Sequence, residues 1–298
     1  MALSELYAAA VRGLLAEERL DAARIAAIGC HGQTIRHRPE QGFTVQIVNA
    51  ALLAERTGIT VVTDFRSRDI AAGGQGAPLV PAFHAACFRS PERHRVVVNI
   101  GGIANLTDLP AAGPVRGFDT GPGNMLLDLS IARHMGADFD RDGQLAAQGD
   151  VIPALLERML ADEYFHRAPP KSTGRERFNA QWLAAMGADD QPAADVQATL
   201  AELSARSIAA AIEQQCTGAQ EVIACGGGVH NSDLMRRLAV RLAGRPLSTT
   251  DAVGVPADWV EAMAFAWLAR QALAHAPGSL PAVTGASGPR ILGAIYPA

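Results

Sequence analysis

The stretch between residues 95 and 124 constrains the fold of this chain more than any other. It contains three apolar runs, at 96–100, 103–109 and 115–118, and each run leads into small or polar residues. A glycine pair separates the first two runs, so they are predicted to form a hairpin, and the third run is predicted to be another strand. A helical pattern follows from Met125. The region therefore predicts an antiparallel meander of three strands that leads into a helix.

The third run ends at Asp119, and Gly101 and Gly102 form the turn of the predicted hairpin. Glycines allow backbone N–H groups to close on an anion such as phosphate. A carboxylate at a strand end beside them can accept a proton during catalysis. The simpler alternative is an ordinary hairpin in which Asp119 caps the following helix.

Composition narrows the class of protein. The length of 298 residues suggests about two domains, and the net charge of −4 argues against nucleic acid or an anionic membrane as the main partner. No signal peptide or apolar run of membrane length is present. The four cysteines lie far apart along the sequence: Cys30, Cys87, Cys216 and Cys225. We therefore expect neither a zinc site nor a disulfide framework, and we expect the protein to work in a reducing cytosol.

The order of the predicted elements indicates an α/β fold. After residue 95, two further strands at 221–225 and 247–250 alternate with helices, so they are predicted to join the sheet in parallel. The long helix among them is predicted to begin at a capping Asp195. Before residue 95, a first helix at 3–20 with Ser4 as its cap precedes strands and helices that match the second half of the same plan. We therefore predict one plan used twice, with its first copy incomplete at the N-terminus.

A second glycine loop, Gly226, Gly227 and Gly228, follows the strand at 221–225. Asn231 or Ser232 is predicted to cap the next helix, whose N-terminus offers free N–H groups. Such a loop can lie against a nucleotide. It is neither a Walker A loop nor a good Rossmann fingerprint, because the required spacings are absent. The alternative is a turn that only packs a strand against a helix.

Polar residues also follow two strand ends in the first part of the chain. Arg66 and Asp69 come after the strand predicted at 59–65, where an arginine could hold a substrate carboxylate in bidentate fashion. The alternative is solvated surface charge. His31 follows the strand at 25–30 and is either a structural histidine or a substrate contact. Glu261 begins the last long helix, where an acid is expected for the helix dipole alone.

Seven motifs in order identify a resemblance to a known family. GCHGQTIRHRP, TDFRSRDIAAGGQGAPLVPAFH, NIGGIANLT, GFDTGPGN, PPKSTGRE, CGGGVHN and DWVEAMAFAWLA closely resemble bacterial 1,6-anhydro-N-acetylmuramic acid kinases. The resemblance covers nearly the whole chain. It implies the sugar kinase/Hsp70/actin fold, with two ribonuclease H-like domains of actin/hexokinase type. Residues 1–94 would be a remnant of the first domain. Residues 95–298 would be the second, with an inserted region at about 136–190 and a C-terminal tail that could return to the first.

The resemblance also implies an activity. Family members are cytoplasmic enzymes of peptidoglycan recycling, usually homodimers, that use ATP and Mg²⁺. They phosphorylate O6 of the anhydro sugar while water opens the anhydro bridge, which gives N-acetylmuramic acid 6-phosphate. Asp119 matches the base that activates this water. The positions that match ATP-binding residues are Gly101, Gly102, Asn105, Gly226, Gly227, Gly228, His230 and Asn231. Those expected around the sugar are His31, Arg66, Asp69, Thr120, Gly121 and Glu261, and no residue is assigned to the metal.

Two departures from the family pattern lead to further expectations. Val48 stands where the family usually has glycine, and it would be strained if that position needs a positive φ. The family's opening segment, close to MSGTSLDGVD, is not found, so three strands of the first sheet are expected to be missing. A start assigned too far downstream or a truncated gene would explain this. The chain as written is then expected to be poorly stable and nearly inactive. The alternatives to an active kinase are an impaired remnant that only dimerises or binds ligand, and a phosphate-releasing hydrolase of the same fold.

Overall fold

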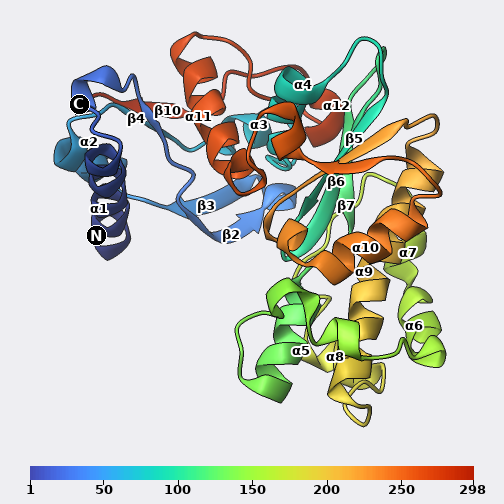
Figure 1. Cartoon of the computed structure of the whole chain (residues 1–298). Helices are drawn as coiled ribbons and strands as arrows, with labels where there is room; N and C mark the ends of the chain where they lie inside the picture. The colour runs from blue at the N-terminus through green and yellow to red at the C-terminus, as the bar shows by residue number, and fades with distance from the viewer. The chain divides into compact units, whose positions relative to one another are not determined.

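The computed structural model describes all 298 residues, and the protein is a mixed α/β structure, as predicted. The chain divides into two compact units, coloured along the sequence in Figure 1. Unit 1 comprises Met1–Ala86 and Glu261–Ala298, and unit 2 comprises Cys87–Val260. The division predicted from the sequence, after residue 94, lies slightly further along the chain than the observed division after Ala86. None of the helices combines the length and apolar character needed to cross a bilayer.

Unit 2 is built on a five-stranded sheet with the order β7-β6-β5-β8-β9. The first three strands pair antiparallel, whereas β8 pairs parallel with β5 and β9 pairs parallel with β8. This arrangement confirms the predicted meander with later strands added in parallel. The strands are β5 (Arg95–Ile100), β6 (Ile103–Leu109), β7 (Arg116–Pro122), β8 (Glu221–Cys225) and β9 (Leu247–Thr249).

Helices pack on this sheet to form the main hydrophobic core. The long helix α9 lies in its centre, and side chains such as Leu203 and Ile208 are fully buried with Val98 and Leu106 of the sheet. Burial of these apolar side chains is the main stabilising contribution of the unit. The helices of unit 2 are α5 (Met125–Met135), α6 (Pro153–Leu160), α7 (Glu163–His166), α8 (Ala180–Ala185), α9 (Ala193–Gln215) and α10 (Ser232–Arg241).

The start of α9 differs from the prediction. The helix begins at Ala193 after Pro192, so Asp195 lies in its first turn and does not cap it. The Asp195 carboxylate instead accepts a hydrogen bond of 2.9 Å from the backbone N–H of Asp150. The sequence pattern located the helix but not this partner, which lies far away along the chain.

Unit 1 contains a three-stranded sheet with the order β1-β4-β10 and a separate hairpin, β2-β3. β1 pairs parallel with β4, and β10 from the C-terminal segment pairs antiparallel with the other side of β4. Strands β2 and β10 were not predicted. The strands are β1 (Ile28–Gly29), β2 (Gln33–Arg38), β3 (Phe43–Ile47), β4 (Val61–Thr63) and β10 (Ala294–Tyr296). The remaining helices are α1 (Ala2–Glu17), α2 (Ala50–Thr57), α3 (Ser67–Ala71), α4 (Val80–Phe88), α11 (Val260–Leu273) and α12 (Pro281–Thr284).

One expectation about unit 1 is wrong, and the condition attached to another is not met. Ser4 does not cap α1; it is buried inside the helix, and its hydroxyl accepts a hydrogen bond of 2.8 Å from the N–H of Asn49. Val48 is not among the non-glycine residues with positive φ, so a valine is not strained at this position. It packs against the small core that contains Leu53 and Val61.

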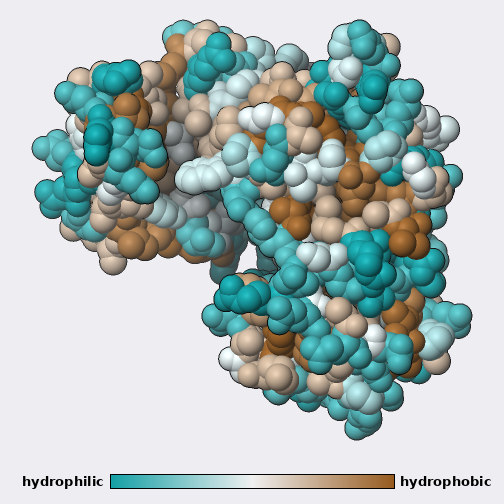
Figure 2. Space-filling model, in the orientation of Figure 1, coloured by the Kyte–Doolittle hydropathy of each residue, from teal (hydrophilic) through white to brown (hydrophobic).

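Large apolar side chains remain exposed in both units, among them Ile35, Phe43, Met135 and Val240. On the face that Figure 2 shows, hydrophobic residues are interspersed with hydrophilic ones. Such scattered exposure is ordinary for a globular protein and does not by itself mark a binding surface.

Candidate functional site

A β-bulge fixes the direction of Asp119 in strand β7. Asn105 of β6 pairs with Asp119, and the preceding Ala104 pairs with Gly121, so Thr120 is the extra residue of the bulged strand. The Thr120 hydroxyl donates a hydrogen bond of 3.1 Å to the carbonyl of Ala104. Bulges of this kind redirect neighbouring side chains and are frequent beside active sites. Thr120 is itself buried, so it shapes the strand at this point.

A segment of the inserted region holds Asp119 from three directions. The N–H of Asp119 donates to the carbonyl of Lys171 at 3.1 Å, and its own carbonyl accepts from the Tyr164 hydroxyl at 2.8 Å. Its carboxylate oxygen Oδ2 accepts a hydrogen bond of 3.0 Å from the N–H of Thr173. The helix that follows is instead preceded by Asn124 as its N-cap residue. The alternative role of Asp119 as a helix cap is therefore wrong.

The surroundings make this carboxylate unusually basic. Burial, with a smaller contribution from the nearby Glu176, raises the pKa of Asp119 to about 6, against the Thr173 N–H and Lys171, which act to lower it. A base with a pKa just below neutrality is largely ionised at pH 7 and still accepts a proton effectively. Among the predicted site residues, Asp119 thus has the properties of a general base.

The glycine turn between β5 and β6 is fixed on one side and open on the other. The carbonyls of Gly101 and Gly102 accept hydrogen bonds of 2.8 and 2.9 Å from the N–H groups of Asn124 and Gly123. A Cβ on Gly101 would meet no heavy atom closer than 3.5 Å, and one on Gly102 none closer than 3.7 Å. The turn therefore leaves space for an anion beside its backbone. Asn105 lies half-buried in β6 below it.

The second glycine loop combines packing with open space. Gly226 has a φ of +81°, and a Cβ there would lie 2.4 Å from the Asn99 side chain; a Cβ on Gly228 would lie 2.2 Å from the Ile100 side chain. These two glycines pack the loop on β5, which is the alternative that the sequence left open. A Cβ on Gly227 would meet no heavy atom within 4 Å, so this glycine faces free space.

Gly227 borders a cavity of about 590 Å³ within unit 2. His230 and Asn231 also line it; Asn231 caps α10 by accepting a hydrogen bond from Leu234, and His230 lies 2.8 Å from a carboxylate oxygen of Asp258. This volume is in the range of small-molecule sites. The remaining lining residues are Asn124, Leu127, Asp128, Phe139, Asp140, Arg141 and Asp142.

Sequence reasoning missed several of these lining residues. The Phe139 ring is 53% exposed, with the Arg141 guanidinium 5.5 Å from its centroid, and an exposed aromatic ring can stack on a planar base. Burial raises the pKa of Asp128 to about 6, against the influence of Arg175. Phe139 and Arg141 belong to the region treated as a loose insertion. The only feature in the sequence of this region that could indicate a binding site is an aromatic residue beside charged ones. That combination is too common in proteins to identify a site.

Within unit 1, the structure brings together His31, Arg66 and Glu261. The Arg66 guanidinium donates to Nε2 of His31 at 2.9 Å and to the carbonyl of Gly76 at 2.8 Å. Burial and the Arg66 charge lower the pKa of His31 to about 4, so its imidazole is neutral and can accept these bonds. The ring also stacks on Phe265 at 4.6 Å. Burial lowers the pKa of Arg66, and the charge of Glu261 opposes this shift.

Asp69 occupies a supporting position that does not fit a direct contact with a sugar. Its side chain is fully buried, and its two oxygens accept hydrogen bonds of 2.8 Å each, from the Gly76 N–H and the Thr284 hydroxyl. Gly76 thereby links Asp69 to Arg66, because its carbonyl accepts from the Arg66 guanidinium. Asp69 positions the arginine through this loop.

No group of three or more His, Cys, Asp and Glu side chains is arranged to hold a metal ion. Mg²⁺ commonly keeps several waters and binds through one or two carboxylates together with substrate phosphates. The open turn at Gly101 and Gly102 leaves room for a phosphate group, so it is compatible with an ion that is bound mainly through phosphate oxygens.

Comparisons with known proteins agree on one family. Residues 1–298 match the family described as "Anhydro-N-acetylmuramic acid kinase". A protein of that name from Thiobacillus denitrificans is 59% identical over 301 residues, covering 100% of this chain and 80% of the relative. Its namesake from Nitrosomonas europaea is 56% identical over 298 residues, covering 99% of this chain and 82% of the relative. Another, from Pseudomonas paraeruginosa, is 55% identical over 295 residues, with coverages of 98% and 81%.

Proposed function

The chain belongs to the anhydro-N-acetylmuramic acid kinase family, and we propose that it phosphorylates O6 of 1,6-anhydro-N-acetylmuramic acid with ATP while water opens the anhydro bridge. The product is N-acetylmuramic acid 6-phosphate, an intermediate of peptidoglycan recycling. The observation that carries this proposal is the Asp119 carboxylate, held by the Thr173 N–H on β7, the strand that pairs with β6 just after the open glycine turn. Phosphoryl transfer needs little beyond positioning, charge stabilisation and a base, and these elements supply them.

Asp119 acts as the general base. Its Oδ2 accepts the Thr173 N–H, and its other oxygen Oδ1 takes the proton of the water that attacks C1 of the sugar. As the oxygen of water bonds to C1, the C1–O6 bond of the anhydro bridge breaks. O6 then takes the γ-phosphoryl group of ATP, the bond between that phosphorus and ADP breaks, and ADP leaves. The burial that raises the pKa of Asp119 makes proton acceptance effective near neutral pH.

ATP binds along unit 2 in this proposal. Its phosphates lie against the backbone of Gly101 and Gly102, and its adenosine enters the cavity beside Gly227, with Phe139 as a stacking surface. Mg²⁺ supplies charge neutralisation on the phosphates when it is bound with ATP. No protein step depends on a dedicated metal cage.

Unit 1 recognises the sugar. Arg66 holds the lactyl carboxylate, because a guanidinium can donate two parallel hydrogen bonds to such a group. His31, kept neutral beside it, fixes the arginine and offers an apolar ring face, and Glu261 contributes an acceptor for sugar hydroxyls. We also propose that the enzyme works in the cytoplasm as a homodimer.

The test is ATP-dependent phosphorylation of the anhydro sugar by purified protein. We expect Asp119→Asn to lower kcat by about a thousandfold, since general bases contribute 10²–10⁴-fold to rates. The control is Asp189→Asn, which removes a carboxylate paired with Arg133 at the surface of the same unit. Full activity of Asp119→Asn would overturn the role of the base. Phosphate release that is independent of the sugar would instead identify a hydrolase.

A further inference from the structure

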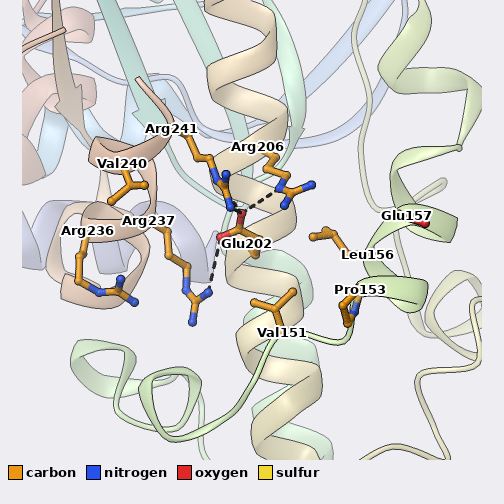
Figure 3. A pocket seen from close by; sticks show the side chains of 10 residues that line it. All are labelled: Val151, Pro153, Leu156, Glu157, Glu202, Arg206, Arg236, Arg237, Val240 and Arg241. Carbon is orange, nitrogen blue, oxygen red and sulfur yellow. Dashed lines mark hydrogen bonds and ion pairs between the residues drawn. The ribbon is translucent and has the colours of Figure 1, made fainter. Parts of the chain in front are cut away.

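A second pocket in unit 2, of about 410 Å³, is lined by four arginines: Arg206, Arg236, Arg237 and Arg241. Figure 3 shows it between helices α9 and α10 and the segment that begins α6. None of the residues assigned to the proposed kinase reaction lines it. We refer to it below as the arginine pocket.

One buried carboxylate organises the arginines. Glu202 of α9 is 3% exposed, and it accepts hydrogen bonds from Nε of Arg206 at 2.9 Å and Nε of Arg241 at 2.7 Å. Arg237 approaches the other oxygen of Glu202 at 3.5 Å, and the dashed lines in Figure 3 mark these three pairs. Arg237 and Arg236 are each bonded, in addition, to the buried carboxylate of Asp233. The guanidinium groups are therefore held in place before any ligand arrives.

The carboxylates do not use up the donors of the guanidinium groups. Each guanidinium has five N–H donors. The Nε of Arg206 binds Glu202, and its terminal nitrogens make no hydrogen bond or ion pair within the protein. Arg241 likewise directs only Nε and one terminal nitrogen at Glu202. Both side chains are about two-fifths exposed, at 39% and 41%, so their remaining donors are accessible.

The charge and the walls of the pocket indicate the kind of ligand. The four guanidinium groups face the carboxylates of Glu157 and Glu202 in the lining, and Arg236 and Arg237 also pair with the buried Asp233, so an excess of one positive charge remains. Apolar side chains of Val151, Leu156 and Val240 form part of the wall. Fixed guanidinium forks match the oxygens of a phosphate in geometry and charge, and the apolar wall suits a carbon skeleton.

We propose that the arginine pocket binds a small organic phosphate, with its phosphomonoester group against Arg206 and Arg241 and its carbon skeleton against Val240 and Leu156. Glu202 is the positioning group that holds the two guanidiniums side by side. A purely structural ion-pair network would instead direct its donors inward and leave no net charge. This inference does not depend on the proposed kinase activity.

The test measures binding of glucose 6-phosphate by titration calorimetry in the presence of saturating ADP, which fills the proposed nucleotide site. Inorganic phosphate, glucose and chloride at equal ionic strength are the comparison ligands. We expect glucose 6-phosphate to bind, and to bind more tightly than inorganic phosphate because of the apolar wall. We expect the double variant Arg206→Gln/Arg241→Gln to lose about tenfold or more in affinity, since two charge-assisted hydrogen-bond donors are removed.

Two further variants make the result specific to the arginine pocket. Val240→Glu places a carboxylate at its mouth on a side chain that is 67% exposed, so the fold should be kept while phosphate binding is lost. Arg133→Gln removes a more exposed arginine of the same unit, paired with Asp189, and should leave binding unchanged. Equal affinity of the wild-type protein and the double variant would overturn the proposal. So would binding of inorganic phosphate as tight as that of glucose 6-phosphate, or no binding beyond that of chloride.

Discussion

At the scale of single residues, the pKa of Asp119 is raised mainly by burial and is adjusted by neighbours of opposite influence. If Asp119 is the base, kcat/KM should fall about tenfold for each pH unit below its pKa of about 6, because only the ionised carboxylate accepts a proton. Initial rates between pH 5 and pH 8 at saturating ATP test this directly.

Two variants should move the acidic limb of the pH profile of kcat/KM in opposite directions. Glu176 raises the pKa of Asp119, so Glu176→Gln should shift the limb to lower pH. Lys171 lowers it, so Lys171→Met should shift the limb to higher pH. A limb that stays in place in both variants would show that another group is titrating.

Asp119 should also affect stability, in a direction that follows from its raised pKa. The folded protein binds this proton more tightly than the unfolded chain does, so the stabilising contribution is complete below about pH 4 and lost as pH rises through about 6. Asp119→Asn cannot ionise. At pH 8 we expect its free energy of unfolding to exceed that of the wild type by an amount on the order of 2 kcal/mol. Its unfolding temperature at that pH should be higher accordingly. This gain should vanish near pH 4. A variant less stable than wild type at pH 8 would contradict the argument.

At the scale of elements, helix α7 supports the strand that carries the base. Burial raises the pKa of Tyr164, so its hydroxyl stays protonated and donates to the Asp119 carbonyl. Tyr164→Phe should lower kcat about fivefold and leave KM for ATP nearly unchanged, since one neutral hydrogen bond of about 1 kcal/mol is lost. Tyr296→Phe in β10, an exposed tyrosine, is the matched control. A change confined to KM for ATP would contradict this role.

A second element-scale prediction concerns the loop after α3. Asp69→Ala leaves the Gly76 N–H and the Thr284 hydroxyl without their acceptor, which should destabilise the protein by roughly 2–4 kcal/mol. Because Gly76 also anchors Arg66, KM for the sugar should rise more than kcat falls. Asp69→Asn keeps one hydrogen-bond acceptor, so it should restore part of the stability and part of the affinity for the sugar. Equal KM values in all three proteins would separate Asp69 from sugar binding.

Local patterns were sufficient to predict much of unit 2. The apolar runs and glycine pair gave β5 and β6 and their antiparallel pairing, and Asn231 does cap α10 as its sequence context suggested. These features depend on residues a few positions apart, and a single sequence records them.

Contacts between distant segments could not be predicted in the same way. The Thr173 N–H that binds Asp119 comes from 54 residues away, and Ser4 meets Asn49 across 45 residues. A serine near a helix start is the usual signature of a cap, but its tertiary partner decided its role. Strand β10 could not be predicted from the sequence either. Its three residues are too few to show a periodic pattern, and its partner β4 lies far away along the chain.

At the scale of the whole molecule, the proposed ligands divide between the two units. The phosphate turn, the base and the cavity beside Gly227 belong to unit 2, whereas His31, Arg66 and Glu261 belong to unit 1. A ligand that binds the native state slows local opening where its contacts lie. The two substrates should therefore protect different sets of backbone amides.

Hydrogen exchange with mass spectrometry tests this division. A non-hydrolysable ATP analogue alone should slow exchange around Gly101 and Gly227, which have open space beside their backbones. The anhydro sugar alone should slow exchange around Gly76, whose carbonyl holds Arg66. Arg66→Gln should abolish the second effect and keep the first, because its guanidinium is needed only for the sugar. Protection of the Gly76 loop by the nucleotide alone would mean that unit 1 binds ATP, and the assignment of the two substrates would then have to be reversed.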